Sequence, residues 1–297
     1  MADLSVVIIN FKTKDLTLKC LQSIFQTKPK VKFEVWLVDN HSEDDTVELV
    51  KRNFPWVKII ESDKNVGFAG GNNLALERIN SRYSLLLNSD TEIKVNSLDM
   101  MVYVADTKKF DILSCKLLNK DGSLQPNGGE LPAFWPLFFW LSGLDDIVGK
   151  AKRIFTYHEK NEGYYQGTKE MGWVGGTAML IKNDVCNKIG FLDNNIFMYG
   201  EDVEFCLRAK RAGFKIGWTD KAVIMHLGGG SSKEPKFNQW KGEFKGLLYI
   251  YKKYYGRVSA IAIRFLFYLF ILLRIISFAV LGKIRYAQTY AKVIVSI

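Results

Sequence analysis

The stretch LSVVIINFKTKDLTLKCLQSIFQ, residues 4–26, decides the fold, because a nearly unbroken apolar run is followed closely by a helical repeat. Residues 4–9 show no polar alternation, which is typical of a strand buried on both faces of a sheet. Residues 14–26 place apolar side chains along one face of a helix. A buried strand that leads into an amphipathic helix is the repeating unit of an α/β protein.

The same alternation continues to the end of the first ninety residues. Strand-like runs at 33–40, 57–62 and 83–90 alternate with helix-like segments at 44–53 and 72–80. This regular alternation predicts a mostly parallel, Rossmann-like sheet with helices on both faces. Ligands of such sheets bind beyond the carboxyl ends of the strands, where the strand order reverses.

The composition limits the class of protein and its partners. The chain has 297 residues, 48% of them hydrophobic, which is enough for one large or two small globular domains. The 41 Lys and Arg residues exceed the 31 Asp and Glu residues, and a net charge of +10 favours an anionic partner such as a nucleotide, nucleic acid or membrane. The four cysteines form no CxxC pair, so we expect buried thiols in a reducing compartment. The first apolar run ends at residue 10 in a polar pattern, so we expect no signal peptide.

Polar residues follow three of the predicted strands. They are Asp39, the glycine-rich segment NVGFAGGNN at 65–73, and Asn88-Ser89-Asp90. The glycine-rich segment lacks both the G-x-G-x-x-G pattern and the P-loop lysine, which disfavours a dinucleotide enzyme or an NTPase, and a tight connection explains it equally well. A carboxylate at the end of a buried strand is costly unless it is solvated, paired or bound to a metal, and Mg²⁺ or Mn²⁺ suits oxygen ligands there.

An acidic pair, Glu201-Asp202, lies within MYGEDVEFCLRAKRAGFKIGW, residues 198–218. The segment 202–212 that follows has helical spacing, and 214–218 alternates like a strand. Taken alone, the pair is explained by helix capping, because an acidic residue in a first turn offsets the helix dipole by about 0.3–1 kcal/mol.

Six motifs in this order resemble glycosyltransferase family 2, and most of all its bacterial rhamnosyltransferase branch. They are SVVIINFKTKDLTLKCLQSI, VDNHSEDDT, NVGFAGGNN, LLLNSDTEI, GWVGGTAMLIKND and FMYGEDVEFCLRAKRAGFKIGW, and together they span roughly residues 4–230. The resemblance implies a GT-A fold, an inverting mechanism, a nucleotide-diphosphate sugar donor and usually a divalent metal. We predict a nucleotide-sugar-binding half at 1–95 and an acceptor-binding and catalytic half at 96–248.

The resemblance also implies roles for residues around the donor. Asp39 would accept the N3–H of uracil or thymine, which cytosine cannot offer, or else be a solvated turn residue. Asp90 and His226 would bind the metal, with Asn88 standing where the family's D-x-D motif has its first acid. Asn88 would contact the ribose or a metal-bound water. The complete set that we expect along the donor is Asn10, Asp39, Asn65, Gly67, Gly70, Gly71, Asn73, Asn88, Trp173, Gly175 and Gly176.

The same resemblance assigns Asp202 as the general base, which takes a proton from the acceptor hydroxyl. Glu201 would orient the acceptor or the base, cap the helix, or take over the role of base. The segment WVGGTAML at 173–180 is predicted to be one strand, with Trp173 either stacking on a sugar or packing on the helix at 202–212. We expect His158 to be a surface residue.

The tail at 249–297 concentrates positive charge and bulky apolar residues. Its longest uncharged stretch, 265–273, is shorter than the roughly 20 residues of a transmembrane helix. As one continuous helix, the tail would place its cations within about 100° of each other, which is typical of an interfacial helix. The cations concerned are Lys253, Arg257, Arg264, Arg274 and Arg285. The alternative is a helical pair that closes a core or a homo-oligomer interface, and the aromatic run at 133–141 is either core or a lipid contact.

The sequence therefore predicts a metal-dependent, inverting glycosyltransferase on the cytoplasmic face of the cell membrane, peripheral or monotopic, with Mg²⁺ or Mn²⁺. The branch favours L-rhamnose from dTDP-rhamnose, passed to a lipid-linked or cell-surface glycan acceptor, and nucleic acid is not an expected partner. One alternative is a UDP-hexose or UDP-N-acetylhexosamine transferase of the same fold. The other is a catalytically idle nucleotide-sugar-binding membrane scaffold.

Overall fold

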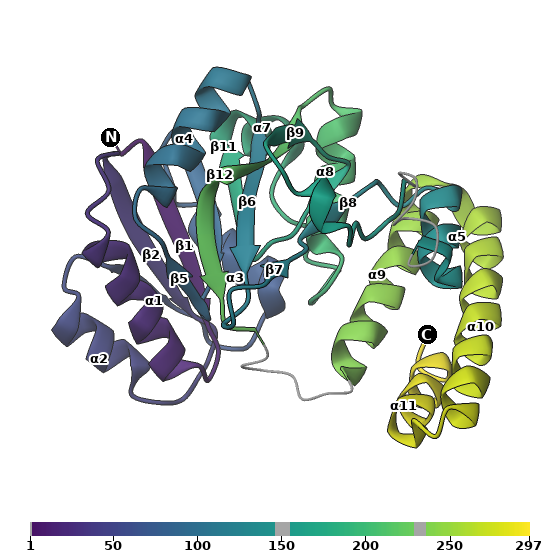
Figure 1. Cartoon of the computed structure of the whole chain (residues 1–297). Helices are drawn as coiled ribbons and strands as arrows, with labels where there is room; N and C mark the ends of the chain where they lie inside the picture. The colour runs from purple at the N-terminus through teal and green to yellow at the C-terminus, as the bar shows by residue number, and fades with distance from the viewer. Residues whose placement is uncertain (1, 146–154, 229–235) are drawn as a thin grey trace.

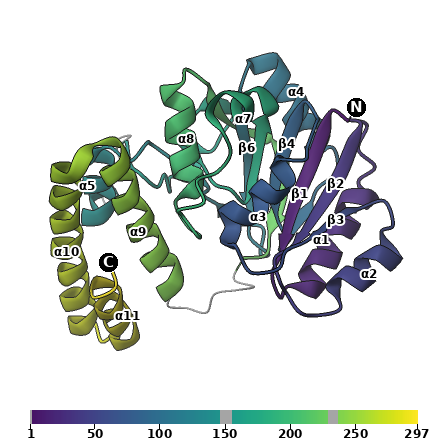
Figure 2. The ribbon, with the colours of Figure 1, turned by 180° about the vertical axis from the view of Figure 1, so that it is seen from behind.

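The computed structural model describes residues 2–145, 155–228 and 236–297, and within these ranges one ten-stranded mixed sheet forms the centre of the protein. Its strands follow the order β3-β2-β1-β4-β11-β6-β12-β5, with β7 paired to β6 and β9 paired to β12. Helices cover both faces, and a separate layer of helices lies beside the sheet (Figures 1 and 2).

The amino-terminal half confirms the predicted parallel sheet. Its parallel strands are β1 (Leu4–Asn10), β2 (Phe33–Asp39), β3 (Lys58–Glu61) and β4 (Tyr83–Asn88). The connecting helices are α1 (Lys14–Gln26), α2 (Thr46–Asn53) and α3 (Gly67–Leu76). Because β1 pairs with both β2 and β4, the carboxyl ends of these three strands meet at one edge.

The helix predicted at 72–80 begins earlier than expected, at Gly67. Its glycines have low helix propensity, which hides the helix in the sequence, and tertiary packing overrides that propensity. A Cβ on Gly71 would lie 3.0 Å from Ile9 Cδ1, so a glycine lets α3 approach β1 closely.

The second half adds the antiparallel strands. β11 runs antiparallel to β4 and β6, β12 runs parallel to β6, and β5 closes the sheet antiparallel to β12. The strands are β5 (Thr91–Ile93), β6 (Ile112–Leu118), β7 (Leu124–Gln125), β8 (Gly128–Gly129), β9 (Thr168–Glu170), β10 (Trp173–Val174), β11 (Ala178–Lys182) and β12 (Ile216–His226). The helices are α4 (Ser97–Lys108), α5 (Phe134–Ser142), η1 (Glu162–Tyr164), α7 (Asn183–Ile189) and α8 (Glu201–Arg211).

The single strand predicted at 173–180 is wrong, because the chain divides it into two. β10 pairs with β8 in a small separate sheet, whereas β11 belongs to the main sheet. Between them the Gly175 N–H donates to the carbonyl of Asn127 (2.8 Å), which turns the chain from one sheet to the other. The strand predicted at 214–218 begins two residues later, at Ile216, and continues to His226.

Two hydrophobic clusters lie on the two faces of the sheet. One is formed with α1, α2 and α4, and the other with α3, α7 and α8. The second cluster extends into the carboxy-terminal helices through a series of neighbouring rings: Trp173, Tyr157, Trp140, Phe244 and Phe267, with centroids 4.9–6.0 Å apart. The helical layer is therefore packed onto the sheet domain through a shared core.

The single continuous helix assumed for the tail is wrong. The chain forms α9 (Phe237–Tyr254), α10 (Gly256–Val280) and α11 (Ile284–Ile294). The breaks fall at Gly256 (φ +84°) and Gly282 (φ +70°), in the left-handed region that glycine adopts at little cost. Residue 249, where the tail was expected to begin, lies inside α9. The aromatic run at 133–141 forms most of α5, which packs against α10 through Phe138 and Phe270 (centroids 5.8 Å apart).

The predicted arc of cations is also wrong, because its members lie on three different helices. Lys253 forms ion pairs with Asp193 (2.7 Å) and Glu204 (2.8 Å). The Arg274 guanidinium donates to the carbonyls of Trp140 and Leu141 (both 3.2 Å). Two of the five cations thus serve contacts within the protein.

Helix α10 supplies an apolar surface instead. In the part of the chain that the structure describes, it is the one helix that is long and apolar enough to cross a membrane, by length and composition alone. The sequence pattern did not identify this helix as a candidate span, because we required an unbroken stretch of uncharged residues. Scattered arginines interrupt that stretch, but the helix as a whole is still apolar. Large apolar side chains of α10 point to solvent, including Val258 (82% exposed), Ile261 (69%) and Phe265 (71%).

Candidate active site

The carboxyl ends of β1 and β2 are joined by hydrogen bonds around Asn10. The Asn10 amide donates to Asp39 Oδ1 and to Ser42 Oγ (both 2.8 Å), and its oxygen accepts from the Thr17 hydroxyl (2.9 Å). Asp39 Oδ2 accepts the Ser42 N–H (3.1 Å). Asn10 is fully buried, so its role here is to orient Asp39. The Asp39 carboxylate retains lone pairs for a further donor.

The glycines of 65–73 mark close backbone packing. A Cβ on Gly67 (φ +75°) would lie 2.2 Å from the Phe197 carbonyl oxygen, and one on Gly70 would lie 2.9 Å from Val66 Cβ. Asn65 Oδ1 accepts the N–H of Gly67 (2.9 Å) and so fixes the start of α3. These contacts place the segment against the loop that precedes Glu201, and its contact with a donor stays a prediction.

Asn73 is committed to a neighbouring loop. Its amide group donates to the Leu192 carbonyl (2.8 Å) and to Asn194 Oδ1 (2.7 Å), and its oxygen accepts the Leu192 N–H (3.1 Å). Both amide hydrogens are therefore used within the protein, and the side chain holds the 192–194 loop onto α3.

The structure brings Asp90 and His226 together, as expected of two ligands of one metal. His226 Nε2 lies 3.1 Å from Asp90 Oδ1, and pairing of β5 with β12 sets this approach. Two ligands of one octahedral cation lie about 3 Å apart, so the distance fits. His226 Nδ1 lies 2.6 Å from Gln125 Oε1. Donation to Gln125 leaves Nε2 with a lone pair for a cation, so Gln125 is an orienting residue that the sequence did not reveal.

The protein alone supplies few ligands for such a cation. Among the described residues, no group of three or more His, Cys, Asp and Glu side chains is arranged to hold a metal ion. The Asn88 side chain makes no hydrogen bond with another described residue, whereas its backbone N–H donates to the Thr177 carbonyl (3.0 Å). A cation at Asp90 and His226 would therefore complete its coordination with diphosphate oxygens and water.

Asp202 is held by two backbone donors at the start of α8. Its Oδ2 accepts the Gly176 N–H (3.0 Å), and its Oδ1 accepts the N–H of Val203 (2.8 Å). A Cβ on Gly176 would lie 3.0 Å from the Phe68 ring and 3.8 Å from Asp202 Cβ. The glycines after Trp173 thus let the backbone approach the Asp202 carboxylate, which stays partly exposed.

The two carboxyl groups of the acidic pair differ in environment. Glu201 is only 5% exposed, and its Oε2 has no hydrogen-bond partner among the described residues. Burial, and then the charge of Asp202, raise the pKa of Glu201 well above its usual range. Burial also raises the pKa of Asp202, but the N–H groups of Gly176 and Val203 oppose that shift. Burial therefore favours the protonated form more strongly at Glu201, whose Oε2 has no partner among the described residues, than at Asp202, whose carboxylate accepts two backbone N–H groups.

His158 was expected on the surface, and that prediction is wrong. Its side chain is 32% exposed, its ring packs between Trp140 and Trp173 (centroids 5.2 and 5.1 Å away), and its Nε2 forms a short contact with Glu243 Oε1. The charge of Glu243 raises the pKa of Asp202, after the larger effect of burial, while His158 lowers it. The His158–Glu243 pair thus belongs to the surroundings of the acidic pair.

Trp173 does not offer a free ring face. It is 5% exposed, its indole N–H donates to the Tyr157 carbonyl (2.8 Å), and its ring packs beside Tyr157 (centroids 5.4 Å apart). The structure therefore agrees with the alternative in which this segment packs on α8, and we do not retain Trp173 as a sugar-stacking residue.

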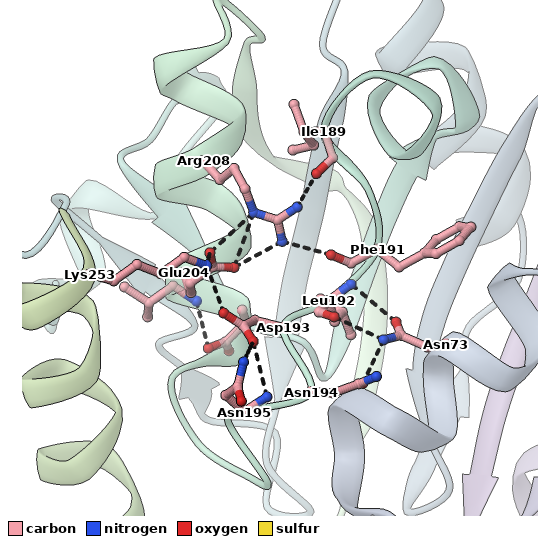
Figure 3. A network of polar contacts seen from close by, with 12 residues as sticks. Asn73, Ile189, Phe191, Leu192, Asp193, Asn194, Asn195, Glu204, Arg208 and Lys253 are labelled. Carbon is pink, nitrogen blue, oxygen red and sulfur yellow. Dashed lines mark hydrogen bonds and ion pairs between the residues drawn. The ribbon is translucent and has the colours of Figure 1, made fainter.

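A buried ionic network fixes the loop that leads to the acidic pair (Figure 3). The fully buried Glu204 accepts from Arg208 Nη2 (2.9 Å), from Lys253 Nζ (2.8 Å) and from the Tyr254 hydroxyl. Asp193 accepts from the same Lys253 (2.7 Å). Burial alone would raise the pKa of Glu204, but these hydrogen bonds outweigh burial and lower it. The network ties α8, α9 and the loop at 189–195 together.

Tyr199 is influenced electrostatically by both centres. Burial is the main cause of the raised pKa of Tyr199, and the charges of Glu201 and Asp90 raise it further. Tyr199 is therefore within electrostatic reach of both the acidic pair and the Asp90–His226 pair. The glycines at 229 and 230 and the serines at 231 and 232 that follow His226 in the sequence lie outside the described residues.

The sheet order, with helices on both faces and polar groups at the carboxyl ends of β1, β2 and β4, is a GT-A fold. A mannosyltransferase from Pyrobaculum calidifontis, solved with GDP-Man and Mn²⁺, matches 98% of this chain and 74% of its own at a TM-score of 0.61 and 14% identity. The chain belongs to glycosyl transferase family 2, whose model matches residues 5–167.

Two curated relatives indicate which kinds of glycosyltransferase are similar to this chain. A low-salt glycan biosynthesis hexosyltransferase of Haloferax volcanii is 29% identical over 228 residues, which is 75% of this chain and 67% of the relative. An N-acetylglucosaminyl-diphospho-decaprenol L-rhamnosyltransferase of Mycobacterium tuberculosis is 21% identical over 206 residues, which is 65% of this chain and 66% of the relative. The match to each relative thus spans about two thirds of its length, and the chain is a glycosyltransferase with hexosyl- and rhamnosyltransferase homologues.

Proposed function

We propose that the protein is an inverting glycosyltransferase that moves a sugar from a pyrimidine nucleotide diphosphate to a lipid-linked glycan acceptor. The observation that carries this proposal is the acidic pair. Asp202 is partly exposed and oriented by two backbone N–H groups, beside a buried Glu201 whose pKa is raised, in a chain that also brings Asp90 and His226 together.

In this reaction Asp202 is the general base. Its carboxylate takes the proton of the acceptor hydroxyl as the oxygen attacks the anomeric carbon from the face opposite the diphosphate. The bond from the anomeric carbon to the diphosphate oxygen breaks, and its electron pair leaves with the diphosphate. The raised pKa of Asp202 suits a base that works near neutral pH, because it strengthens the carboxylate as a proton acceptor.

On the donor side, Asp39 accepts the N3–H of the uracil or thymine ring, held in place by Asn10 and Ser42. Asp90 and His226 would hold Mg²⁺ or Mn²⁺ against the diphosphate, with Gln125 orienting the imidazole. When bound, the cation neutralises charge that develops on the leaving diphosphate.

For the sugar we propose L-rhamnose from dTDP-rhamnose, supported by the name of the Mycobacterium tuberculosis relative, which also gives a lipid diphosphate acceptor. A UDP-hexose or UDP-N-acetylhexosamine donor is the second candidate, because the Haloferax volcanii hexosyltransferase has the higher identity. Asp39 fits the pyrimidine of either donor, so the two differ only at the sugar. An idle scaffold is disfavoured, because the chain has Asp90, Asp202 and His226, and the first and last of these lie 3.1 Å apart.

A panel of nucleotide sugars in a thermal-shift assay tests the donor site. We expect dTDP-rhamnose or a UDP-sugar to stabilise the protein more in Mn²⁺ than in EDTA, and GDP-mannose to stabilise it least. A donor at about 100 times its dissociation constant adds about 2.7 kcal/mol of stability. Asp90→Ala should remove the metal-dependent part. The matched control is Asp184→Ala, an exposed carboxylate on α7 at the opposite edge of the sheet. Equal stabilisation in EDTA and Mn²⁺ would remove the metal from the mechanism.

We also propose that the exposed apolar face of α10 associates with the cytoplasmic face of the cell membrane. Replacing Ile261 and Phe265 by Glu should abolish flotation with vesicles of phosphatidylcholine and phosphatidylglycerol, because two charges would enter an apolar surface. Val95→Glu with Tyr103→Glu is the control, since these apolar residues are also exposed but lie outside the helical layer. Unchanged flotation together with loss of an oligomer would make this face an assembly interface instead.

A further inference from the structure

A cavity of about 540 Å³ lies between α9 and the loop that leads into the acidic pair. The loop contributes Phe197, Met198 and Tyr199 to its wall, and α9 contributes Asn238, Lys241 and Lys245. Glycines let the two walls meet at one end, because a Cβ on Gly246 would lie 2.6 Å from the Tyr199 carbonyl oxygen.

Two lysines of α9 give the cavity a positive charge. Lys241 and Lys245 are one helical turn apart on α9, and neither forms an ion pair with any residue that the structure describes. Among the described residues that line the cavity, none is acidic. Residues four apart on a helix have Cβ atoms about 5–6 Å apart. Two ammonium groups at this spacing suit an anion with two neighbouring charged groups better than an anion with one. Two ammonium groups of this kind suit a diphosphate.

The cavity is amphipathic as well as charged. Phe197 is 56% exposed and Met198 is 40% exposed, and both border the lysines. An apolar group attached to the anion would therefore find apolar side chains beside the charged ones. Inorganic phosphate or a free nucleotide has no such group to place there.

The position of α9 relates the cavity to both the base and the apolar surface. From the cavity wall the loop continues directly to Gly200, Glu201 and Asp202. Another side of α9 packs on α10 through Phe244 and Phe267 (centroids 4.9 Å apart). A ligand in this cavity would therefore lie against the loop that leads into the acidic pair and against α9, which packs on the apolar helical layer.

We propose that this cavity binds the diphosphate of the lipid-linked acceptor, with Lys241 and Lys245 as its ligands; this inference rests on the proposed function, which makes the acceptor lipid-linked. The acceptor sugar extends toward Asp202, and the first units of the lipid chain lie against Phe197 and Met198. The donor diphosphate belongs to Asp90 and His226, so the two diphosphates occupy separate sites. A phospholipid headgroup carries one phosphate and would leave one lysine unused.

The test uses farnesyl diphosphate as a soluble probe, titrated against the full-length protein in EDTA without a donor. We expect Lys241→Gln with Lys245→Gln to weaken binding of the probe about tenfold or more, because two charge-assisted contacts are lost. Lys19→Gln with Lys252→Gln is the matched control, since it removes the same charge from exposed positions outside the cavity. Binding of dTDP with Mn²⁺ should be unchanged in both double variants.

Three other outcomes would overturn the inference. If Lys241→Gln with Lys245→Gln lost dTDP binding, the cavity would belong to the donor. If this double variant kept farnesyl diphosphate binding but no longer floated with phosphatidylglycerol vesicles, the cavity would bind a membrane phospholipid. No binding of farnesyl diphosphate to a wild-type protein that binds dTDP would reject the cavity alone, whereas failure of all nucleotide sugars to bind would reject the proposed function itself.

Discussion

Replacing Asp202 by Asn is expected to lower the rate of sugar transfer by about 10²–10⁴-fold while donor binding stays near the wild-type level. The amide of Asn has the same shape, and its oxygen can still accept one of the two backbone N–H groups, from Gly176 or from Val203. The amide cannot take a proton from the acceptor hydroxyl, so the chemical step slows. Initial rates at saturating donor and acceptor, together with a dTDP titration, separate these two effects.

Glu201→Gln is the matched variant in the neighbouring position. Because Glu201 is buried and its pKa is raised well above the usual range, a neutral amide should change the rate only a few-fold. The opposite result, a large loss with Glu201→Gln and a small one with Asp202→Asn, would transfer the role of base to Glu201.

Replacing Glu204 by Ala is expected to lower the free energy of unfolding by about 3–5 kcal/mol, because it leaves Arg208 and Lys253 without their buried partner. Denaturant unfolding at pH 7 measures the loss. Glu48→Ala, on an exposed position of α2, should stay within about 0.5 kcal/mol of the wild type. A loss below about 1 kcal/mol for Glu204→Ala would mean that solvent screens the network.

The pH dependence of this effect follows from the lowered pKa of Glu204. A carboxyl group whose pKa is lower in the folded state contributes its full stability above its unfolded pKa of about 4.3. That contribution is lost as the pH falls through the folded pKa. The difference in stability between the wild type and Glu204→Ala should therefore narrow in acid.

The amino-terminal strands and helices could be predicted because their signals are local. The apolar run at 4–9 and the helical repeat at 14–26 each contain their own pattern, and the structure places β1 and α1 there. The start of α3 could not be predicted, since Gly67 and Gly71 disfavour a helix locally and are required by close packing on Phe197 and Ile9. Both glycines at the breaks of the tail, Gly256 and Gly282, are visible in the sequence. The assumption of one continuous helix failed because both residues adopt a left-handed backbone conformation that ends a helix.

In the candidate site too, some residues could be predicted from the sequence and others could not. The family resemblance pointed to Asp90 and His226, and the structure places them 3.1 Å apart, although their role as metal ligands stays a prediction. The pair of His158 and Glu243 could not be found, because 85 positions separate the two residues and neither belongs to a recognisable motif. Trp173 looked available for a sugar because its burial depends on packing against Tyr157 and His158, which no local pattern in the sequence reveals.

The anomeric configuration of the product tests the central claim most directly. The wild-type protein would be incubated with dTDP-rhamnose, Mn²⁺ and an N-acetylglucosaminyl-diphospho-lipid, and the new glycosidic linkage would be assigned by NMR. A single attack assisted by Asp202 predicts one linkage whose configuration is inverted relative to the donor. A linkage with retained configuration, or cleavage of the donor without any transfer, would contradict the account.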